Sequence, residues 1–141
     1  MQISTKGKYA VRIMLDVAKY SAGGAVRTQD ISERQSISVK YAEQITALLV
    51  KGGLLRSARG AGGGYTLVKR ADEYKISEIL LKTEGELMPV DCVTDSCPKS
   101  GGCAVQSLWS GLYKAVHDYL DSVTLQNLLD SSSDGGDNYV I

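Results

Sequence analysis

Residues 28–68 read TQDISERQSISVKYAEQITALLVKGGLLRSARGAGGGYTLV, and this segment carries the signals of two short helices and a hairpin. Thr28 offers a side-chain oxygen as the N-cap of a first helix that ends at Gln35. After a break at residues 36–38, the apolar side chains of residues 39–51 fall on one helical face, and two glycines then stop this second helix. Two short helices joined by a tight turn predict a helix-turn-helix.

A further helix precedes this pair, and a hairpin follows it. Residues 5–20 place apolar side chains at the i, i+1, i+4, i+5 spacing of a helix with one buried face. Residues 54–59 and 65–68 are predicted strands around a flexible Gly-Ala-Gly-Gly-Gly turn. The predicted fold class is mostly α with a small β-hairpin wing: a winged helix-turn-helix followed by a long dimerisation helix.

That long helix is predicted from an apolar stripe in the second half of the chain. Residues 76–84 form a brief amphipathic helix, and the segment after it has little periodicity. From residue 103 or 104 to residue 123, one stripe then continues over about five turns. A chain of this size offers limited surface to cover it, so we expect homodimerisation through this helix, with packing on its own winged helix as the alternative. The stripe comprises Val105, Leu108, Trp109, Leu112, Val116, Tyr119, Leu120 and Val123.

The distribution of charge favours a polyanionic partner for the first half of the chain. The net charge is zero, but residues 1–70 carry 12 Lys and Arg against 4 Asp and Glu, and residues 71–141 carry 4 against 12. An excess of positive charge attracts DNA over long range, although the two halves could instead pack together within a dimer. No stretch has the apolar length of a membrane span, and the N-terminus lacks a signal-peptide core, so we expect a cytoplasmic protein.

The glycine-rich turn favours contact with DNA over nucleotide binding. GAGGGY is not followed by Gly-Lys-Ser/Thr, and its third fingerprint position holds Tyr65, which excludes the two common phosphate-binding loops. Arginines at positions 56 and 59 flank the turn, so its tip can approach a phosphate backbone while arginine enters a groove. A plain flexible hairpin is the alternative. With one histidine and no base–nucleophile pair, we do not expect an enzyme.

These elements divide the chain into four segments. We expect a winged-helix DNA-binding domain at residues 1–84 and a cysteine-bearing loop at residues 85–103. The dimerisation helix and a short final helix, which Thr124 can cap, occupy residues 104–130. The remaining residues, 131–141, are polar and glycine-containing, so we expect a mobile tail.

Three cysteines lie close together in the loop. Cys92, Cys97 and Cys103 form the pattern Cys-x4-Cys-x5-Cys within twelve residues. Stable disulfides are rare in the cytosol, so a soft metal centre is the better interpretation. Structural zinc usually takes Cys-x2-Cys pairs, which favours an iron–sulfur cluster here, with zinc and free thiols as alternatives.

A cluster normally needs a fourth protein ligand, and the residues leave its identity open. His117 is the only histidine, but it lies about four helical turns beyond the last cysteine, so it would more readily serve the other subunit. Lone helical histidines are more often exposed or packed. Asp91, Asp95, Gln106 and Ser107 are nearer, and a carboxylate is the most plausible donor among them.

Several segments together resemble one known branch of regulators. These are KGKYAVRIMLDVA, DISERQSIS, YAEQI, RGAGGGY, the three cysteines and SLW. The chain resembles the bacterial IscR-type iron–sulfur cluster regulators, within a wider family of winged-helix transcription factors, nearly end to end except for the tail. The resemblance implies a homodimer that binds twofold operator DNA and holds one 2Fe-2S cluster per subunit on Cys92, Cys97 and Cys103. It also implies repression or activation of cluster-assembly genes.

The resemblance implies specific contacts to DNA. Glu43 and Gln44 would face base edges in the major groove, flanked by Lys40 and Tyr41, and Arg59 would enter the minor groove. Glu43 is similar to a residue that discourages one class of DNA site unless the cluster is present; a solvated helix charge is the alternative. The complete set of expected DNA-binding residues is Thr28, Ser38, Lys40, Tyr41, Glu43, Gln44, Arg59, Gly62 and Gly63.

The chain also departs from this pattern. The first cysteine spacing is one residue shorter, and Gln106 stands where the family has its histidine ligand. Lys8 occupies the position at which a nitric-oxide-sensing branch has an acidic ligand, and Lys40 replaces a small hydroxyl residue. The alternatives are a cluster-free winged-helix regulator of cysteine or sulfur metabolism, a redox or nitric oxide sensor of the same fold, and, less favoured, an iron–sulfur carrier.

Overall fold

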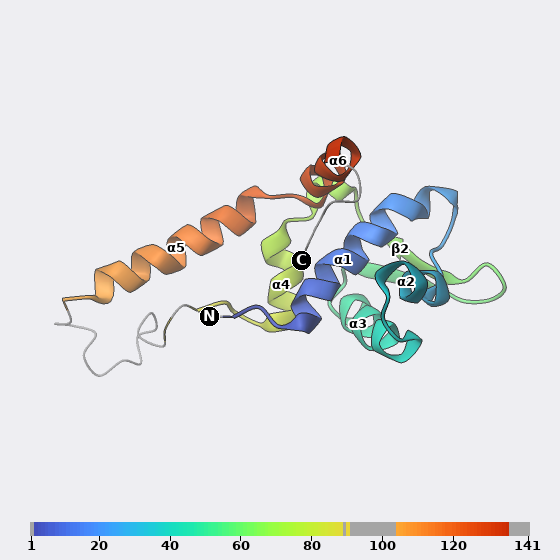
Figure 1. Ribbon diagram of the computed structural model, residues 1–141, viewed down its shortest axis with the longest axis horizontal. Helices are drawn as coiled ribbons and strands as arrows, with labels where there is room; N and C mark the ends of the chain where they lie inside the picture. Colours follow the sequence, from blue (N-terminus) through green and yellow to red (C-terminus); the bar gives the residue numbers. More distant parts are fainter. Residues whose placement is uncertain (1, 89, 91–103, 136–141) are drawn as a thin grey trace.

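The computed structural model describes residues 2–88, 90 and 104–135, with the backbone alone for residues 133–135. Six α-helices, two 3-10 turns and one hairpin follow one another in these ranges (Figure 1). In chain order they are α1 (Thr5–Tyr20), η1 (Ser21–Gly23), α2 (Thr28–Gln35), α3 (Val39–Lys51), β1 (Leu55–Ala58), β2 (Gly64–Leu67), η2 (Ala71–Glu73), α4 (Ile76–Glu84), α5 (Gln106–Ser122) and α6 (Leu125–Gly135).

The core forms around α1, which contacts α2, α3, α4, α6 and β2. Its predicted apolar face is confirmed, because Ala10, Ile13, Met14 and Val17 are fully buried. Burial of each large side chain of this kind stabilises the fold by about 1.5–3 kcal/mol. The mostly helical fold with a two-stranded wing matches the predicted class.

The helix-turn-helix is closed by local hydrogen bonds. Ser36 adopts a left-handed conformation (φ 56°), and Ser32 Oγ donates to the carbonyl oxygen of Ile37 at 2.6 Å. Ser38 then caps α3 by accepting a hydrogen bond from the Tyr41 amide at 3.0 Å. The prediction that Thr28 caps α2 is wrong: the N-cap is Arg27, whose carbonyl accepts the Ile31 amide, so Thr28 already lies inside the first turn.

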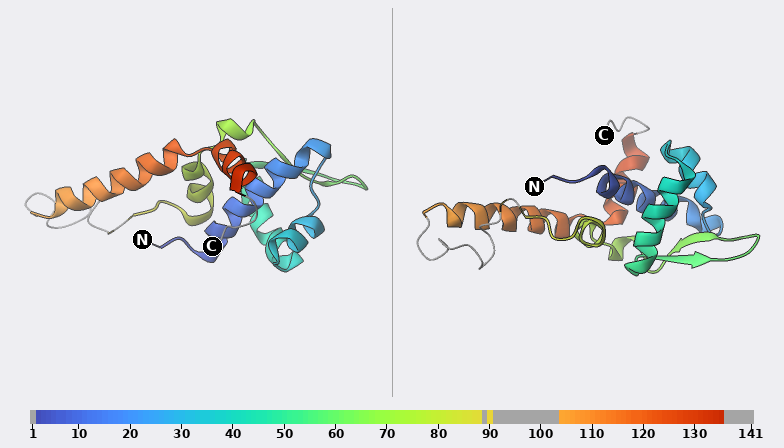
Figure 2. Two further views of the ribbon diagram at one scale, coloured as in Figure 1. Left: turned by 45° about the horizontal axis from the view of Figure 1, so that its top comes forward. Right: turned by 90° about the horizontal axis from the view of Figure 1, so that it is seen from below.

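The wing is an antiparallel pair in which Leu55 faces Leu67 and Ala58 faces Gly64. The predicted strands 54–59 and 65–68 differ from the observed ones by one residue at each end. The amide of Leu54 bonds to the end of α3 and that of Val68 bonds to a side chain, so neither belongs to the ladder. The hairpin leaves the same end of the molecule that carries α2 and α3 (Figure 2).

Helix α5 projects from the opposite end (Figures 1 and 2). It begins at Gln106, two or three residues later than predicted, and its last turn packs on the core through Leu120 and Val123. Among the residues that the structure describes, no helix is both long and apolar enough to cross a bilayer.

Helix α6 returns to the body and buries Leu125 completely. Thr124 Oγ1 accepts the Asn127 amide at 3.1 Å, which confirms the predicted cap. The helix continues to Gly135, past the residue 131 at which we expected the tail to begin. The hydroxyls of Ser131 and Ser132 donate to the carbonyls of Asn127 and Leu129 within the helix.

Candidate DNA-binding surface and cofactor region

Helix α3 presents a polar face to solvent at its N-terminal end. Lys40, Glu43 and Gln44 are exposed at i, i+3, i+4 spacing. The opposite face is buried through Ala42, Ile45, Thr46 and Leu49, which fixes the rotation of the helix about its axis. Three side chains able to hydrogen-bond to bases or phosphates therefore point away from the core together.

The other residues near α3 that we expect to contact DNA differ in their exposure and in their contacts within the protein. Tyr41 is half-buried and packs edge-on against Tyr9 at 6.0 Å between ring centroids. Ser38 is exposed, but its hydroxyl oxygen already accepts the α3 cap bond. Thr28 is half-buried at the start of α2. Their roles in DNA binding stay predictions.

An unpredicted ion pair attaches α2 to α1. Arg34 donates to both carboxylate oxygens of Asp16 at 2.9 and 2.8 Å, and Gln35 donates to one of them at 3.0 Å. The Arg34 guanidinium also lies 4.0 Å from the ring centroid of Tyr20. The hydrogen bond to Asp16 raises the pKa of Arg34. Asp16 is buried but is not one of the apolar positions of the predicted α1 stripe, so helical spacing alone did not indicate that it needs a partner cation.

The wing tip combines an exposed arginine with an open glycine turn. Arg59 is exposed, and the Gly63 amide closes the turn on the carbonyl of Gly60 at 2.9 Å. Gly62 is exposed, and a Cβ added there would meet nothing within 4 Å. A backbone without side chains can approach a phosphate closely.

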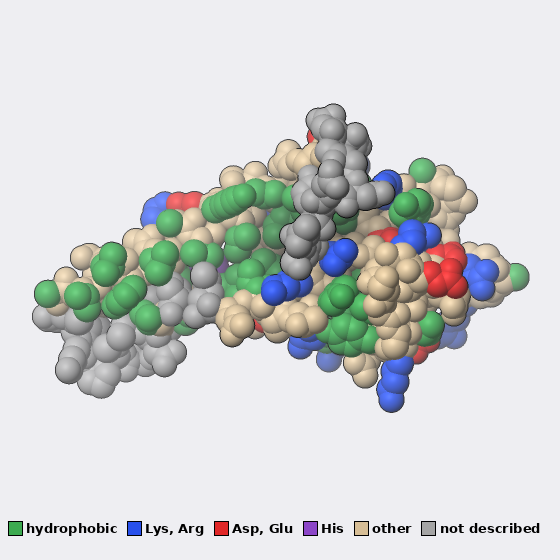
Figure 3. Space-filling view, in the orientation of Figure 1, with side chains coloured by type: hydrophobic (Ala, Val, Ile, Leu, Met, Phe, Trp, Pro, Cys, Tyr) green, Lys and Arg blue, Asp and Glu red, His purple; other side chains and the backbone are tan. Residues whose placement is uncertain are grey.

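Several cations near α3 and the wing are available to an external anion. Within the described residues, no carboxylate lies at ion-pair distance from Lys40, Arg56 or Arg59. In the space-filling view, Lys and Arg side chains project from the lower and right parts of the body, whereas apolar side chains follow α5 (Figure 3). The positive first half predicted from the sequence thus has unpaired charges on the expected surface.

The cysteine region is seen only through its flanks, because Cys92, Cys97, Cys103 and Asp95 lie outside the described residues. On the flank that follows α4, the Leu87 carbonyl lies 2.9 Å from Nε2 of His117. One turn earlier on α5, Tyr113 donates to Glu86, and this bond raises the pKa of Tyr113. Helix α5 therefore holds the residues that lead into the cysteine segment.

Two of the described candidates for a fourth ligand, Gln106 and His117, are far apart. Gln106 is the first residue of α5, three residues after Cys103, and His117 follows eleven residues later, about 16 Å along the helix. One small cluster cannot contact both within a subunit. His117 is half-buried, with its ring 4.2 Å from that of Tyr113, so it has a packing role inside its own subunit.

The outer part of α5 carries an uncovered apolar stripe. Leu108, Leu112 and Tyr119 are 58%, 41% and 59% exposed. At 100° per residue these three positions lie within about 40° of one another, so they form a line along the helix. Exposed apolar lines of this kind are typical of association surfaces. An open groove between α4 and α5, lined in part by Leu81 and Leu87, adjoins the inner end of the helix.

Comparison with known proteins agrees with this architecture. Residues 3–131 match the Rrf2 family, described as an iron-dependent transcriptional regulator. The chain is 39% identical to the HTH-type transcriptional regulator IscR of Pectobacterium atrosepticum over 132 residues, which cover 93% of this chain and 80% of that protein.

Solved structures give the same result. CymR (YrzC), the global cysteine regulator of B. subtilis, superposes with a TM-score of 0.80 at 34% identity, covering 93% of this chain and 98% of that one. The IscR of T. potens superposes with a TM-score of 0.77 at 33% identity, covering 99% and 94%. These proteins are regulators and not enzymes, and the chain itself belongs to the Rrf2 family of winged-helix transcriptional regulators.

Proposed function

We propose that the chain is a homodimeric regulator whose binding to twofold operator DNA depends on an iron–sulfur cluster held by Cys92, Cys97 and Cys103. The observation that carries the proposal is the joint occurrence of an exposed polar face on α3 and of three cysteines in the segment that precedes α5 in the sequence. In this proposal the polar face of α3 contacts DNA bases, the cysteines hold the cluster whose presence is sensed, and α5 joins two subunits. Genes of cluster assembly or related processes are the expected targets, with repression the expected sign.

In this proposal the exposed face of α3 enters the major groove. Glu43 accepts a hydrogen bond from a cytosine amino group, Gln44 pairs with adenine, and Lys40 reaches a phosphate. Arg59, about four residues out from the base of the wing, enters the adjacent minor groove. The unpaired cations of the surface support these assignments.

Homodimerisation through α5 is supported by its exposed line of Leu108, Leu112 and Tyr119. The line lies on the part of α5 that extends beyond the body, where no other element of the described residues covers it (Figure 1). Two copies of the helix packed together would remove these side chains from water, and a symmetric dimer matches a twofold operator.

The donor set suits iron and sulfur. Three thiolates are soft ligands, and their spacing lacks the Cys-x2-Cys pairs of structural zinc. A 2Fe-2S cluster, one per subunit, would supply a redox-sensitive group in the segment that connects α4 to α5 in the sequence. Gln106, His117 and Asp95 are the candidates for its fourth ligand, with Gln106 the nearest described residue in sequence.

The contacts around Glu86 and Leu87 suggest how occupancy of the site reaches DNA. Tyr113 and His117 hold these two residues, so a cluster that orders the following segment stiffens residues 86–103 against α5. When α5 is held in one orientation, it sets the distance between the two winged-helix domains of the dimer, and a different distance favours different operators.

A cluster-free regulator of cysteine or sulfur metabolism is the second candidate. The similarity to CymR, a global cysteine regulator, favours it. The cysteine trio separates the two candidates, because only a cluster regulator needs three thiolates aimed at one centre.

The test is an absorption spectrum of anaerobically purified protein, with iron and sulfide assays, compared with the variant Cys92→Ala. Visible charge-transfer bands and about two irons per chain, lost in the variant, support the cluster. A colourless protein with zinc or no metal after attempted reconstitution overturns the cluster and leaves the second candidate.

A further inference from the structure

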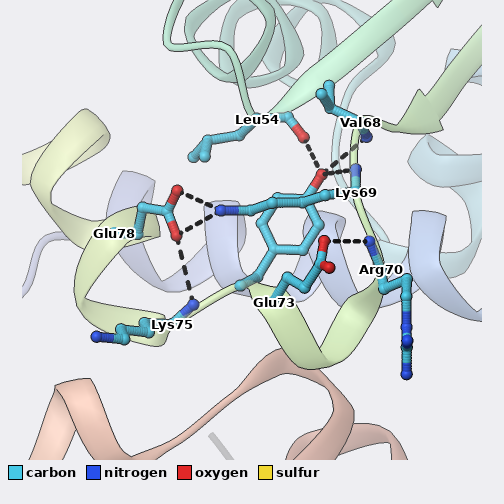
Figure 4. Close-up of polar contacts among 8 residues, drawn as sticks. Leu54, Val68, Lys69, Arg70, Glu73, Lys75 and Glu78 are labelled. Atoms are coloured by element: carbon cyan, nitrogen blue, oxygen red, sulfur yellow. Dashed lines mark hydrogen bonds and ion pairs between the residues drawn. The ribbon is translucent and has the colours of Figure 1, made fainter.

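The base of the wing is closed by one buried tyrosine. Tyr74, between η2 and α4, has no exposed surface and is among the largest fully buried side chains. Its hydroxyl accepts the Val68 amide at 2.8 Å and the Lys69 amide at 3.3 Å, and it donates to the Leu54 carbonyl at 2.8 Å (Figure 4). Since Leu55 faces Leu67, residues 54 and 68 are the next pair of the ladder, and the hydroxyl joins them instead.

Lys69 covers the same ring from the solvent side. Its Nζ lies 4.8 Å from the ring centroid of Tyr74 and pairs with both carboxylate oxygens of Glu78, at 2.8 and 3.1 Å. Because Glu78 belongs to α4, this ion pair fixes the end of the wing to that helix. The hydroxyl is thereby kept from water, where its bonds would compete with solvent.

Within the described residues, β2 has one other hydrogen-bonded attachment to the body, and the wing also packs on the core through Leu55, Tyr65 and Leu67. Tyr65 and Val26 exchange two backbone hydrogen bonds, at 2.9 and 2.8 Å. Loss of the Tyr74 bonds therefore loosens the wing at its base and lets it tilt about the Tyr65–Val26 attachment. Tyr65 faces Ser57, about 7 Å of strand from Arg59, so a tilt of about 20° displaces the arginine by about 2 Å, enough to break a hydrogen bond.

The backbone around the same tyrosine contacts the junction between α5 and α6. The Tyr74 carbonyl accepts the Leu125 amide at 3.0 Å, and the Ile76 amide donates to the Val123 carbonyl at 3.0 Å. These bonds attach residues 74–76 to the junction between α5 and α6. The side chain thus holds the wing while its main chain holds the end of the projecting helix.

We propose that Tyr74 is a positioning residue that sets the direction of the wing and ties it to the α5–α6 junction. The part of this inference that concerns DNA rests on the proposed function, because it requires the wing to contact DNA. The part that concerns the wing and the junction does not. Tyr74 itself touches no base or phosphate and acts through the placement of Arg59.

The test compares Tyr74→Phe, Arg59→Ala and the double variant with the wild type. The matched control is Tyr20→Phe, because the Tyr20 side chain is 44% exposed at the end of α1. The DNA probe is a duplex that the wild-type protein selects from a random library, and binding is measured by fluorescence anisotropy at fixed salt. Backbone amide exchange of the free proteins is measured in parallel.

We expect Tyr74→Phe to weaken binding about fivefold or more, with an effect below about 1.5-fold once Arg59 is alanine. Amides of Val68 and Lys69 should exchange faster, while those of Val26 and Tyr65 stay protected. The role in DNA binding is overturned if Tyr74→Phe binds DNA with wild-type affinity. It is also overturned if the loss of affinity in the double variant equals the product of the losses in the two single variants.

Failure of the proposed function has a different signature. If the wild type selects no duplex, or Arg59→Ala binds as tightly as wild type, DNA contact by the wing is wrong. In that case the amide exchange of Tyr74→Phe still tests whether Tyr74 positions the wing. Faster exchange confined to the amides of Val68 and Lys69 supports this role, and unchanged exchange overturns it.

A second pair of variants tests the tie to the junction, and it serves also if Tyr74→Phe does not fold. Ile76→Pro removes the amide that binds Val123, at the first residue of α4, where proline is tolerated, and Ile76→Val keeps the amide. Lys75 precedes it with φ −91° and ψ 144°, which suits a residue before proline. Faster exchange at Val68 and Lys69 in Ile76→Pro than in Ile76→Val supports the tie, and equal exchange overturns it.

Discussion

We expect Leu112→Glu to dissociate the dimer while leaving the winged-helix domain folded. Leu112 lies on the exposed line of α5 and is 41% exposed, and its neighbour Leu108 is 58% exposed. Together they leave roughly one leucine side chain in water, so their burial in a symmetric dimer contributes about 2 kcal/mol per protomer and about 4 kcal/mol in total.

The substitution removes part of this burial and adds a charge. In each protomer, the loss of the leucine forfeits roughly 1 kcal/mol of apolar contact, and the new carboxylate enters the interface, where desolvation costs at least as much again. Both protomers carry the change, so the dimer loses about 4 kcal/mol, and its Kd rises about 10³-fold.

Sedimentation equilibrium over a range of concentrations measures this Kd. Ser110→Glu is the control, because this substitution adds the same charge on the opposite side of α5. Residue 110 is exposed and lies about 180° around the helix from the line of Leu108, Leu112 and Tyr119. We expect its Kd to stay within about threefold of wild type. A Leu112→Glu protein that dimerises as tightly as Ser110→Glu would refute the assignment of this face to the dimer.

Three further substitutions test the ion pair between α1 and α2, the attachment of the wing at Val26, and the exposed face of α3. Asp16→Asn should lower the free energy of unfolding by about 2 kcal/mol in a urea melt, since Asp16 is 1% exposed but Arg34 is 31% exposed and can turn to solvent; a loss below about 0.5 kcal/mol contradicts the pairing. Gly64→Ala should cost about 2 kcal/mol in thermal unfolding, because its φ is 151° and a Cβ would lie 2.3 Å from the Val26 carbonyl; wild-type stability contradicts this. Glu43→Ala should relax base preference by about 1–3 kcal/mol at one operator position in library selection, and an unchanged consensus argues against base contact.

The helical framework could be predicted from the sequence because its signals are local. The limits of α1, α3 and α4 match the predictions, since apolar spacing and glycine stops act within one or two turns. The cap of α2 was misplaced by one residue because threonine is a good cap only where the backbone is extended, and here Arg27 has that conformation.

Contacts between distant residues could not be predicted in the same way. The hydroxyl of Tyr74 donates to the carbonyl of Leu54, twenty residues away, and no sequence pattern near Tyr74 predicts this hydrogen bond. Thr46 lies on the buried face of α3, where its hydroxyl donates to the Ala42 carbonyl, so a polar residue belongs to the core. Such partners are set by tertiary packing, which a periodic pattern does not specify.

The candidate site was predicted unevenly. The exposure of Lys40, Glu43 and Gln44 follows from helical spacing once the buried face of α3 is known. The cluster ligands stay predictions, because residues 91–103 lie outside the described ranges. The contact of His117 with Leu87 depends on how α5 lies against the residues after α4, which the spacing of the cysteines does not determine.

The most direct test of the account is the affinity of cluster-loaded protein and of Cys92→Ala for the same set of selected duplexes, measured anaerobically at fixed salt. The account predicts that at least one class of duplex separates the two proteins by about tenfold or more, while their dimer Kd values agree. Equal affinities for every duplex, with the cluster verified in one protein and absent from the other, would contradict control of DNA binding by the cluster.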